Sequence, residues 1–382
     1  MNVTAEFQNL VRPIRRFWSD LFAPLRRAWA RQPKPVRWAI GAIGIALLYL
    51  LPVINPPIIT TEPGVNFSSV LGGTIVLYVL VALGLNVVVG MAGMLDLGYA
   101  GFYAVGAYVC GVLTSKHASW PWIASLPVAV LVTMLAGLIL GSPTLRLRGD
   151  YLAIVTLGFG EIIRIVAKNV DWLGAAEGIS NIKRPVFDQW EFDVINTDPY
   201  YWLYLTITIG VVFLLRRLVN SRVGRAWTAI REDEDAAELM GVPTFKFKLL
   251  AFAIGAAIGG LAGVLFAGKN GLIYPTTFDI QLSILFLAAV VLGGSGSITG
   301  AIVGGVLVSY LPERFRFLKE SRYFWFGIVL VFIMVFRPQG LIGSRRRRRE
   351  IANPQDQPDF PGVAGSDLAE ATEPHEGGTR HA

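Results

Sequence analysis

The chain has 382 residues, of which 53% are apolar and only 16% are charged, and its net charge is +7. Soluble domains carry about 25% charged residues, so these charges could not cover the surfaces of two or three soluble domains. The composition therefore excludes a secreted disulfide scaffold, a disordered chain and most soluble enzymes. It indicates an all-α polytopic membrane protein.

Cysteine, histidine and basic residues limit the chemistry further. The chain has one cysteine and three scattered histidines, so we expect no internal disulfide and no metal site. Residues 1–37 hold eight Arg or Lys against two acids, and residues 345–349 are five arginines. Basic flanks of apolar runs are topology signals, so we expect these charges to face a lipid bilayer and not nucleic acid.

Apolar runs that could cross a bilayer follow one another from residue 38. A crossing of roughly 30 Å needs about twenty apolar residues. Two of the runs are short and are separated by the Gly- and Ser-rich residues 293–297, so we expect about eight to ten spans, some of them broken or re-entrant. The candidate spans are 38–54, 68–90, 97–114, 122–141, 151–167, 200–219, 249–268, 281–293, 298–311 and 323–337.

The remaining charges suggest an orientation and domain limits. The loops at 142–150 and 216–248 are basic, whereas 168–199 holds three basic residues against six acidic ones. We therefore expect the basic loops and both termini to be cytoplasmic. The predicted parts are a basic amphipathic arm over 1–37, a transmembrane domain over 38–342, and an arginine cluster with a disordered acidic tail over 343–382.

Two glycine clusters interrupt apolar runs in the first and second halves of the chain. Such interruptions point to broken helices around a solute pathway and to an internal pseudo-repeat. At the small-xxx-small steps elsewhere, close helix packing is the main expectation. The broken-helix candidates are Gly90, Gly93, Gly98, Gly293, Gly294 and Gly296.

Four polar residues stand inside or beside apolar runs, namely Asn86, Asp96, Glu161 and Arg164. A polar group in a membrane faces protein or water, which makes it a pathway candidate. Glu161 and Arg164 are three residues apart and could pair on one helix, either as a structural ion pair or in the pathway. For Asp96 at a helix break, capping of backbone amides is favoured over cation binding.

The segment 221–242 is charged, and it predicts a cytoplasmic helix of about twenty residues that ends at Gly241 and Pro243. It could dock onto another protein or simply connect two spans. The nearby run from Gly263 to Lys269 has P-loop spacing, but Asn270 replaces the Ser or Thr that binds magnesium, and a membrane helix precedes it. We therefore predict that the chain is not an enzyme and hydrolyses no ATP by itself.

These residues carry a family resemblance. Asp235-Ala236-Ala237, followed by Gly241, resembles the EAA-type loop of ABC importer permeases, with Asp in place of the leading Glu. Further runs are similar to the LivM permeases of branched-chain amino acid ABC importers, and the match is collinear from about 70 to 342, although residues 174–178 depart from the usual pattern. The similar runs are 97–108, 145–164, 224–234 and 337–341.

The resemblance implies a bacterial inner-membrane permease. It would work with a LivH-like second permease, two cytoplasmic ATPases that bind ATP and Mg, and a periplasmic binding protein for leucine, isoleucine or valine, with no cofactor in this chain. Segment 221–242 would be the helix that couples the permease to an ATPase. The implied coupling residues are Arg231, Glu232, Asp233, Glu234, Asp235, Ala236, Ala237 and Gly241.

Other functions stay open at this point. The same architecture could import urea, amides or another small solute. An ion-coupled carrier is disfavoured because no chain of acidic residues and histidines runs through the spans. An integral membrane enzyme is disfavoured because no nucleophile and base, or set of metal ligands, stands out in them.

Overall fold

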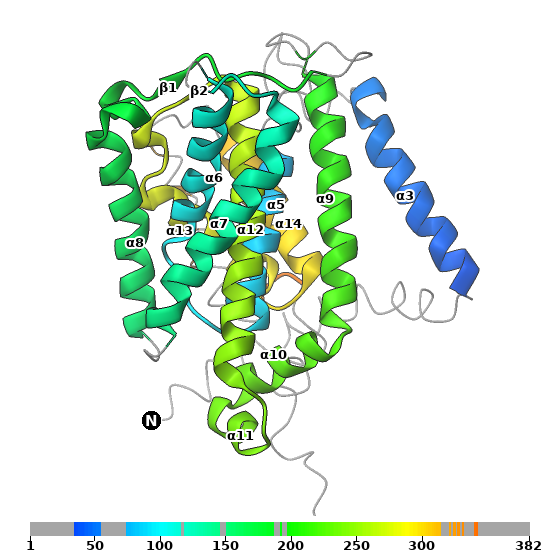
Figure 1. Cartoon of the computed structure of the whole chain (residues 1–382). Helices are drawn as coiled ribbons and strands as arrows, with labels where there is room; N and C mark the ends of the chain where they lie inside the picture. The colour runs from blue at the N-terminus through cyan, green and yellow to red at the C-terminus, as the bar shows by residue number, and fades with distance from the viewer. Residues whose placement is uncertain are drawn as a thin grey trace, which may run out of the picture. The chain divides into compact units, whose positions relative to one another are not determined.

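The computed structural model describes residues 34–54, 74–115, 118–145, 150–186, 192 and 197–314, with short pieces at 321–331 and at 340–342 (Figure 1). The chain divides into two compact units, Met1–Ser344 and Arg345–Ala382, and the second lies outside the described residues. So do the predicted span 323–337, apart from a few residues, and nearly all of the predicted arm.

Helices make up almost all of the described chain, which confirms the prediction of an all-α polytopic fold. Four helical segments are long and apolar enough to cross a membrane, and four shorter apolar ones accompany them. The main helices are α3 (Lys34–Ile54), α5 (Val76–Leu85) with the π-helix η2 (Asn86–Met91), α6 (Tyr99–Thr114), α7 (Trp122–Thr144), α8 (Asp150–Asn169), α9 (Asp198–Val219), α10 (Arg222–Glu232), α11 (Glu234–Leu239), α12 (Thr244–Asn270), α13 (Ile280–Gly293) and α14 (Ile298–Arg314).

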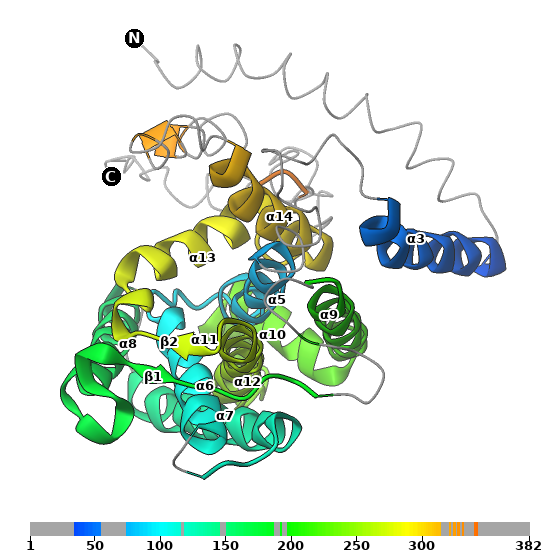
Figure 2. The ribbon, with the colours of Figure 1, turned by 90° about the horizontal axis from the view of Figure 1, so that it is seen from above.

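Helix α12 lies at the centre of the bundle, against α5, α6 and α7 (Figure 2). In α12, 67% of the most apolar stretch is buried, against 28% in α7 and in α9. Glycines permit this packing, as expected for small-xxx-small steps. A Cβ atom on Gly106 of α6 would lie 2.1 Å from the carbonyl oxygen of Gly260, and one on Gly263 would lie 2.1 Å from that of Tyr103.

Helix α3 packs on α9 through hydrogen bonds to its own backbone. Pro52 lies inside α3 and has no N–H to donate to the carbonyl four residues earlier, that of Leu48. The hydroxyl of Tyr201 on α9 donates to this oxygen at 2.7 Å, and the indole N–H of Trp202 donates to the next carbonyl, that of Tyr49, at 3.1 Å. These contacts attach α3 to the bundle at its proline.

A small layer of short turns and strands covers the end of the bundle away from α10 and α11 (Figure 1). Two 3₁₀ turns, η3 (Asp171–Leu173) and η4 (Ala175–Glu177), lead into strand β1 (Ile179–Ser180). This strand pairs antiparallel with β2 (Leu272–Ile273), with Ile179 opposite Ile273. A third turn, η5 (Pro275–Thr277), follows β2 and leads into α13. The pairing joins the loop after α8 to the end of α12.

The contact between α6 and α12 generates a stability prediction. In Gly106→Ala the new Cβ atom would overlap a backbone oxygen, so the helices must separate, at a cost of about 1–3 kcal/mol of unfolding free energy. We expect a lower melting temperature for the purified protein in detergent. The matched control is Gly210→Ala on α9, where no atom of the described residues, apart from the nearby backbone of α9 itself, lies within 4 Å of the new Cβ. Equal melting of both variants and the wild type would contradict the packing described here.

Candidate functional site

The first predicted break follows helix α5. Residues Asn86–Met91 form a π-helix, and the amides of Ala92 and Met94 still donate to the carbonyls of Val87 and Val88 at 3.1 Å. The chain then turns at Gly93, whose φ of +78° is readily adopted only by glycine. Short π-helical segments are frequent at functional sites. The break therefore lies where the glycine cluster predicts it.

The second predicted break lies between α13 and α14. Gly294 and Gly296 have φ angles of +113° and +82°, which end α13 and direct the chain into α14. The amides of Leu341 and Ile342 donate at 2.9 Å to the carbonyls of Leu292 and Gly293, at the end of α13. The family-like run at 337–341 thus ends in residues that satisfy a helix terminus.

Arg231 of α10 brings the two breaks together. Its guanidinium Nη1 donates to the carbonyl of Gly90, and the amide of Gly296 donates to the side-chain oxygen of Asn86 at 2.8 Å. A Cβ atom on Gly296 would lie 2.3 Å from that Nη1, and one on Gly93 would lie 2.8 Å from Cγ of the same arginine. Glycine at these positions therefore leaves the space that Arg231 occupies. Asn86, Gly90, Gly93, Arg231 and Gly296 are called the junction below.

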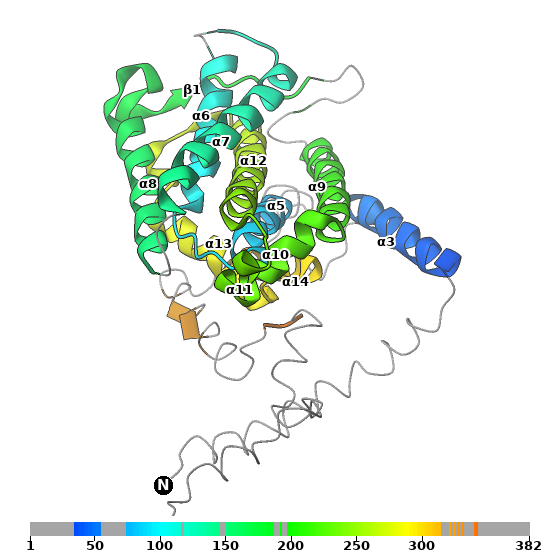
Figure 3. The same cartoon turned by 60° about the horizontal axis from the view of Figure 1, so that its bottom comes forward.

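The segment 221–242 forms two helices, which corrects the single helix of about twenty residues predicted above. The backbone of Asp233 is extended, with φ −156° and ψ 113°, and separates α10 from α11. Its carboxylate accepts the amide hydrogen of Ala236 at 2.9 Å and so caps α11. Ser221 caps α10 in the same way, through the amide of Val223. Figure 3 shows both helices at one end of the bundle, where α10 packs on α9, α12 and η2.

The predicted coupling residues divide between the bundle and the solvent. Glu234 forms an ion pair with Lys248 of α12, and Ala237 is buried. Gly241, with φ +82°, ends α11 in a Schellman motif, in which its own amide and that of Val242 donate to Glu238 and Ala237. The exposed members of the set are Glu232, Asp233, Asp235, Ala236 and Gly241.

Asp96 caps the turn before α6, as predicted. One carboxylate oxygen accepts the amide hydrogen of Gly98 at 2.9 Å. The other oxygen is buried and has no hydrogen-bond partner within the described part of the chain. The amide of Leu97 donates to Thr156 of α8 at 3.1 Å, and a Cβ atom on Gly98 would lie 1.7 Å from the carbonyl oxygen of Thr156. The first break therefore rests directly on α8.

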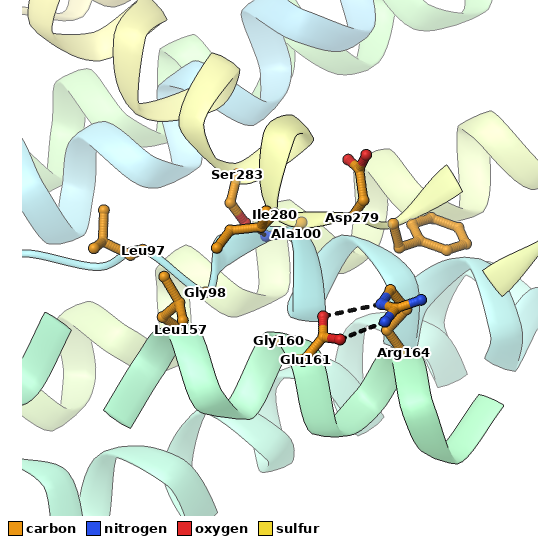
Figure 4. Close-up of a pocket in the computed structure, with 11 residues that line it drawn as sticks. Leu97, Gly98, Ala100, Leu157, Gly160, Glu161, Arg164, Asp279, Ile280 and Ser283 are labelled. Atoms are coloured by element: carbon orange, nitrogen blue, oxygen red, sulfur yellow. Dashed lines mark hydrogen bonds and ion pairs between the residues drawn. The ribbon is translucent and has the colours of Figure 1, made fainter. Parts of the chain in front are cut away.

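A pocket of about 350 Å³ opens beside this contact, between α6, α8 and the start of α13 (Figure 4). Glu161 and Arg164 line it and pair as predicted: Nε and Nη2 of the arginine donate to the two carboxylate oxygens, the first at 2.9 Å. Asp279 lies on the opposite wall and caps α13 by accepting the amide hydrogen of Leu282 at 3.0 Å. Ser283 accepts the amide hydrogen of Ala100 at 3.1 Å.

Several site residues were absent from the sequence-based set, namely Thr156, Lys248, Asp279 and Ser283. Asp279 stands just before an apolar run, which is the usual signal for a helix N-cap. The other three could not be predicted from the neighbouring sequence, because their partners lie elsewhere in the fold. Among the described residues, no group of three His, Cys, Asp or Glu side chains could hold a metal ion.

Comparison of the sequence with known proteins identifies a family. The family described as branched-chain amino acid transport system, permease component, matches residues 69–337. The high-affinity branched-chain amino acid transport permease LivM of Salmonella typhimurium is 42% identical over 301 residues, which cover 73% of this chain and 71% of the relative. LivM of Escherichia coli K12 is 41% identical over 299 residues, or 72% of this chain and 70% of that protein.

A more distant relative is the permease LivH of Salmonella typhimurium, which is 26% identical over 289 residues, or 70% of this chain and 91% of the relative. No solved structure matches the chain. The family match covers well over half of the chain, and the LivM relatives are similar over more than two thirds of it. The chain belongs to the family of branched-chain amino acid transport permeases.

Proposed function

We propose that this chain is the membrane-spanning subunit of an ATP-driven importer that carries branched-chain amino acids. The observation that carries the proposal is the identity of 42% and 41% with two high-affinity LivM permeases over more than two thirds of the chain. A periplasmic binding protein would deliver the solute, and separate subunits would bind ATP and Mg and hydrolyse the nucleotide. In this assignment the chain is a permease and not an enzyme, and it needs no cofactor of its own.

The partners follow from the same assignment. Both LivM and LivH occur among the relatives, which supports pairing with a second, LivH-like permease. The end of the bundle with α10 and α11 would face the bacterial cytoplasm together with both termini, because the basic loops gather there. The layer of β1 and β2 would then face the periplasmic binding protein.

Helix α11 supports docking of an ATPase at the cytoplasmic end. Leu239 and Met240 are 88% and 84% exposed at its tip, and Glu232 and Asp235 of the same segment are exposed as well. Large apolar side chains in adjacent exposed positions at a polar surface are typical of a protein contact. We assign Leu239 and Met240 as the apolar anchors of this contact, with the exposed acids as its rim.

The junction supports a path from this contact into the bundle. Arg231 is only two residues from Asp233, where α10 ends, and it reaches the carbonyl of Gly90 at the first break. Asn86 joins that break to the second through Gly296. A movement of α10, which also packs on α9 and α12, would therefore pull on both breaks. This is how ATPase closure would reach the solute pathway.

The docking assignment predicts the effect of charge at the tip of α11. A glutamate in the double variant Leu239→Glu/Met240→Glu cannot be buried in an apolar cleft without a large cost. When the variant permease pair is purified by affinity chromatography, we expect the amount of ATPase that copurifies to fall about tenfold or more, as loss of interface anchors predicts. Val186→Glu, at another exposed apolar position, is the control. Undiminished ATPase recovery with the double variant would contradict the assignment.

The junction predicts an uncoupled transporter. In Arg231→Ala the carbonyl of Gly90 loses a charge-assisted hydrogen bond, so ATPase movement no longer reaches the breaks. We expect ATP hydrolysis to persist in reconstituted vesicles while leucine uptake falls about tenfold or more. Arg225→Ala, on the exposed face of the same helix, should transport normally. Equal uptake by Arg231→Ala and the wild type would remove Arg231 from the path.

The proposed function itself is tested by uptake into vesicles. The complex with its binding protein and ATPases is given radiolabelled leucine, urea or glutamate, with and without ATP. We expect ATP-dependent uptake of leucine only. Uptake of urea would favour the alternative solute class, and uptake driven by an ion gradient without ATP would favour an ion-coupled carrier.

A further inference from the structure

The pocket between α6, α8 and α13 combines charged and apolar walls. Its charged groups are Glu161 and Arg164 on α8 and, on the other side of the opening, Asp279 at the start of α13, whose carboxylate points away from the pair in Figure 4. Its apolar wall includes Leu97, Leu157, Phe278 and Ile280. Its volume of about 350 Å³ lies at the small end of the range for ligand sites, roughly 300–1,000 Å³.

The ion pair is open to this space. The side chain of Glu161 is 42% exposed and that of Arg164 is 24% exposed, although both lie in the middle of α8. Other side chains of the same helix are exposed and apolar, including Ile154 at 65% and Ile162 at 58%. A charged pair on a helix with such an apolar surface must face protein or water, and here it faces the pocket.

The geometry of the ion pair leaves hydrogen-bonding groups of both side chains available to a ligand. Arg164 uses Nε and Nη2 toward Glu161, so the hydrogens on Nη1 can serve an incoming acceptor. The carboxylate of Glu161 has further lone pairs beyond the two that it gives to Arg164. A positive and a negative group therefore stand side by side at the pocket, as the two charges of an amino acid zwitterion do.

We propose that this pocket binds an amino acid zwitterion in transit: Arg164 binds its carboxylate, Glu161 binds its ammonium group, and the apolar wall holds its side chain. This inference rests on the proposed function and names the site of its solute within the chain. The apolar wall suits an aliphatic side chain, which would be removed from water there. A neutral solute such as urea has no charges to match the pair.

The position of the pocket links binding to the first break. Leu97 and Gly98, which line the pocket, belong to the turn between η2 and α6 and contact Thr156 of α8. The other end of the same turn begins at Gly93, in contact with Arg231. A solute in the pocket therefore touches the segment that the junction holds, and movement of that segment changes one wall of the pocket.

The test uses the complete reconstituted complex with its binding protein at saturation. Arg164→Ala and Glu161→Gln each remove one charge, and Ile162→Ala on the same helix is the control. We expect leucine uptake to fall about tenfold or more in Arg164→Ala, as the loss of a charge-assisted hydrogen bond predicts, while ATP hydrolysis stimulated by the binding protein persists. Uptake by both charge variants within twofold of the control would overturn the proposal.

The charge-swapped variant Glu161→Arg/Arg164→Glu separates binding from a purely structural pair. It can restore an ion pair, but it places each charge where the zwitterion needs the other. We expect uptake to stay low although the complex assembles, and recovery to more than half of the wild-type rate would overturn the proposal. If Arg164→Ala does not assemble, the near-isosteric Glu161→Gln decides in the same way. Failure of the wild-type complex to import leucine would instead remove the proposed function.

Discussion

A helix that stops inside a bundle leaves backbone carbonyls without partners, and in an apolar interior water cannot supply them. This constraint governs both breaks of the permease. The carbonyl of Gly90, at the end of η2, accepts from the guanidinium of Arg231, and the last carbonyls of α13 accept from the amides of Leu341 and Ile342. Each broken end is thus satisfied by a segment remote in sequence, and that requirement fixes where those segments lie.

The two ends are satisfied by different kinds of donor, with different consequences. Backbone amides at 341 and 342 belong to a segment of fixed geometry, which holds α13 in place. A guanidinium on a long side chain follows the helix that carries it, and a positive charge is favourable at a helix C-terminus. The first break is therefore attached to α10, and through α10 to the helix pair that would meet the ATPase.

Local features of this fold could be predicted from the sequence, and long-range ones could not. Apolar length predicted eight of the apolar helices, although α8, predicted as the span 151–167, is not among those apolar enough to cross a membrane. Glycines predicted both breaks. Each of these features depends on residues that are adjacent in the chain. The contact of Arg231 with Gly90 joins residues 141 positions apart, and that of Gly296 with Asn86 joins residues 210 apart. The sequence around either residue gives no indication of its partner. Arg231 could therefore be predicted only as part of a coupling segment, and its contact with the first break could not be predicted.

Two helix caps that were not predicted depend on local sequence and could have been recognised from it. Asp233 is a good helix-capping residue in the middle of a charged run, and it divides the segment into α10 and α11. Asp279 precedes the apolar run of α13 and caps it. The pairing of Glu161 with Arg164 could be predicted from their spacing, but the pocket in front of them depends on α6 and α13. The internal pseudo-repeat and the domain limits stay predictions.

The partner of Arg231 in the first break is a backbone carbonyl, so it has no side chain that mutation could alter. A genetic screen for suppressors of an Arg231 defect would find no compensating charge at position 90. A Cβ atom there would lie 2.4 Å from the backbone nitrogen of Gly296 and 2.0 Å from the side-chain oxygen of Asn86. Compensation must come from residues that shift the whole break. Selection on the contact between α10 and the first break would then retain glycines at these positions, and it would not produce pairs of residues that change together.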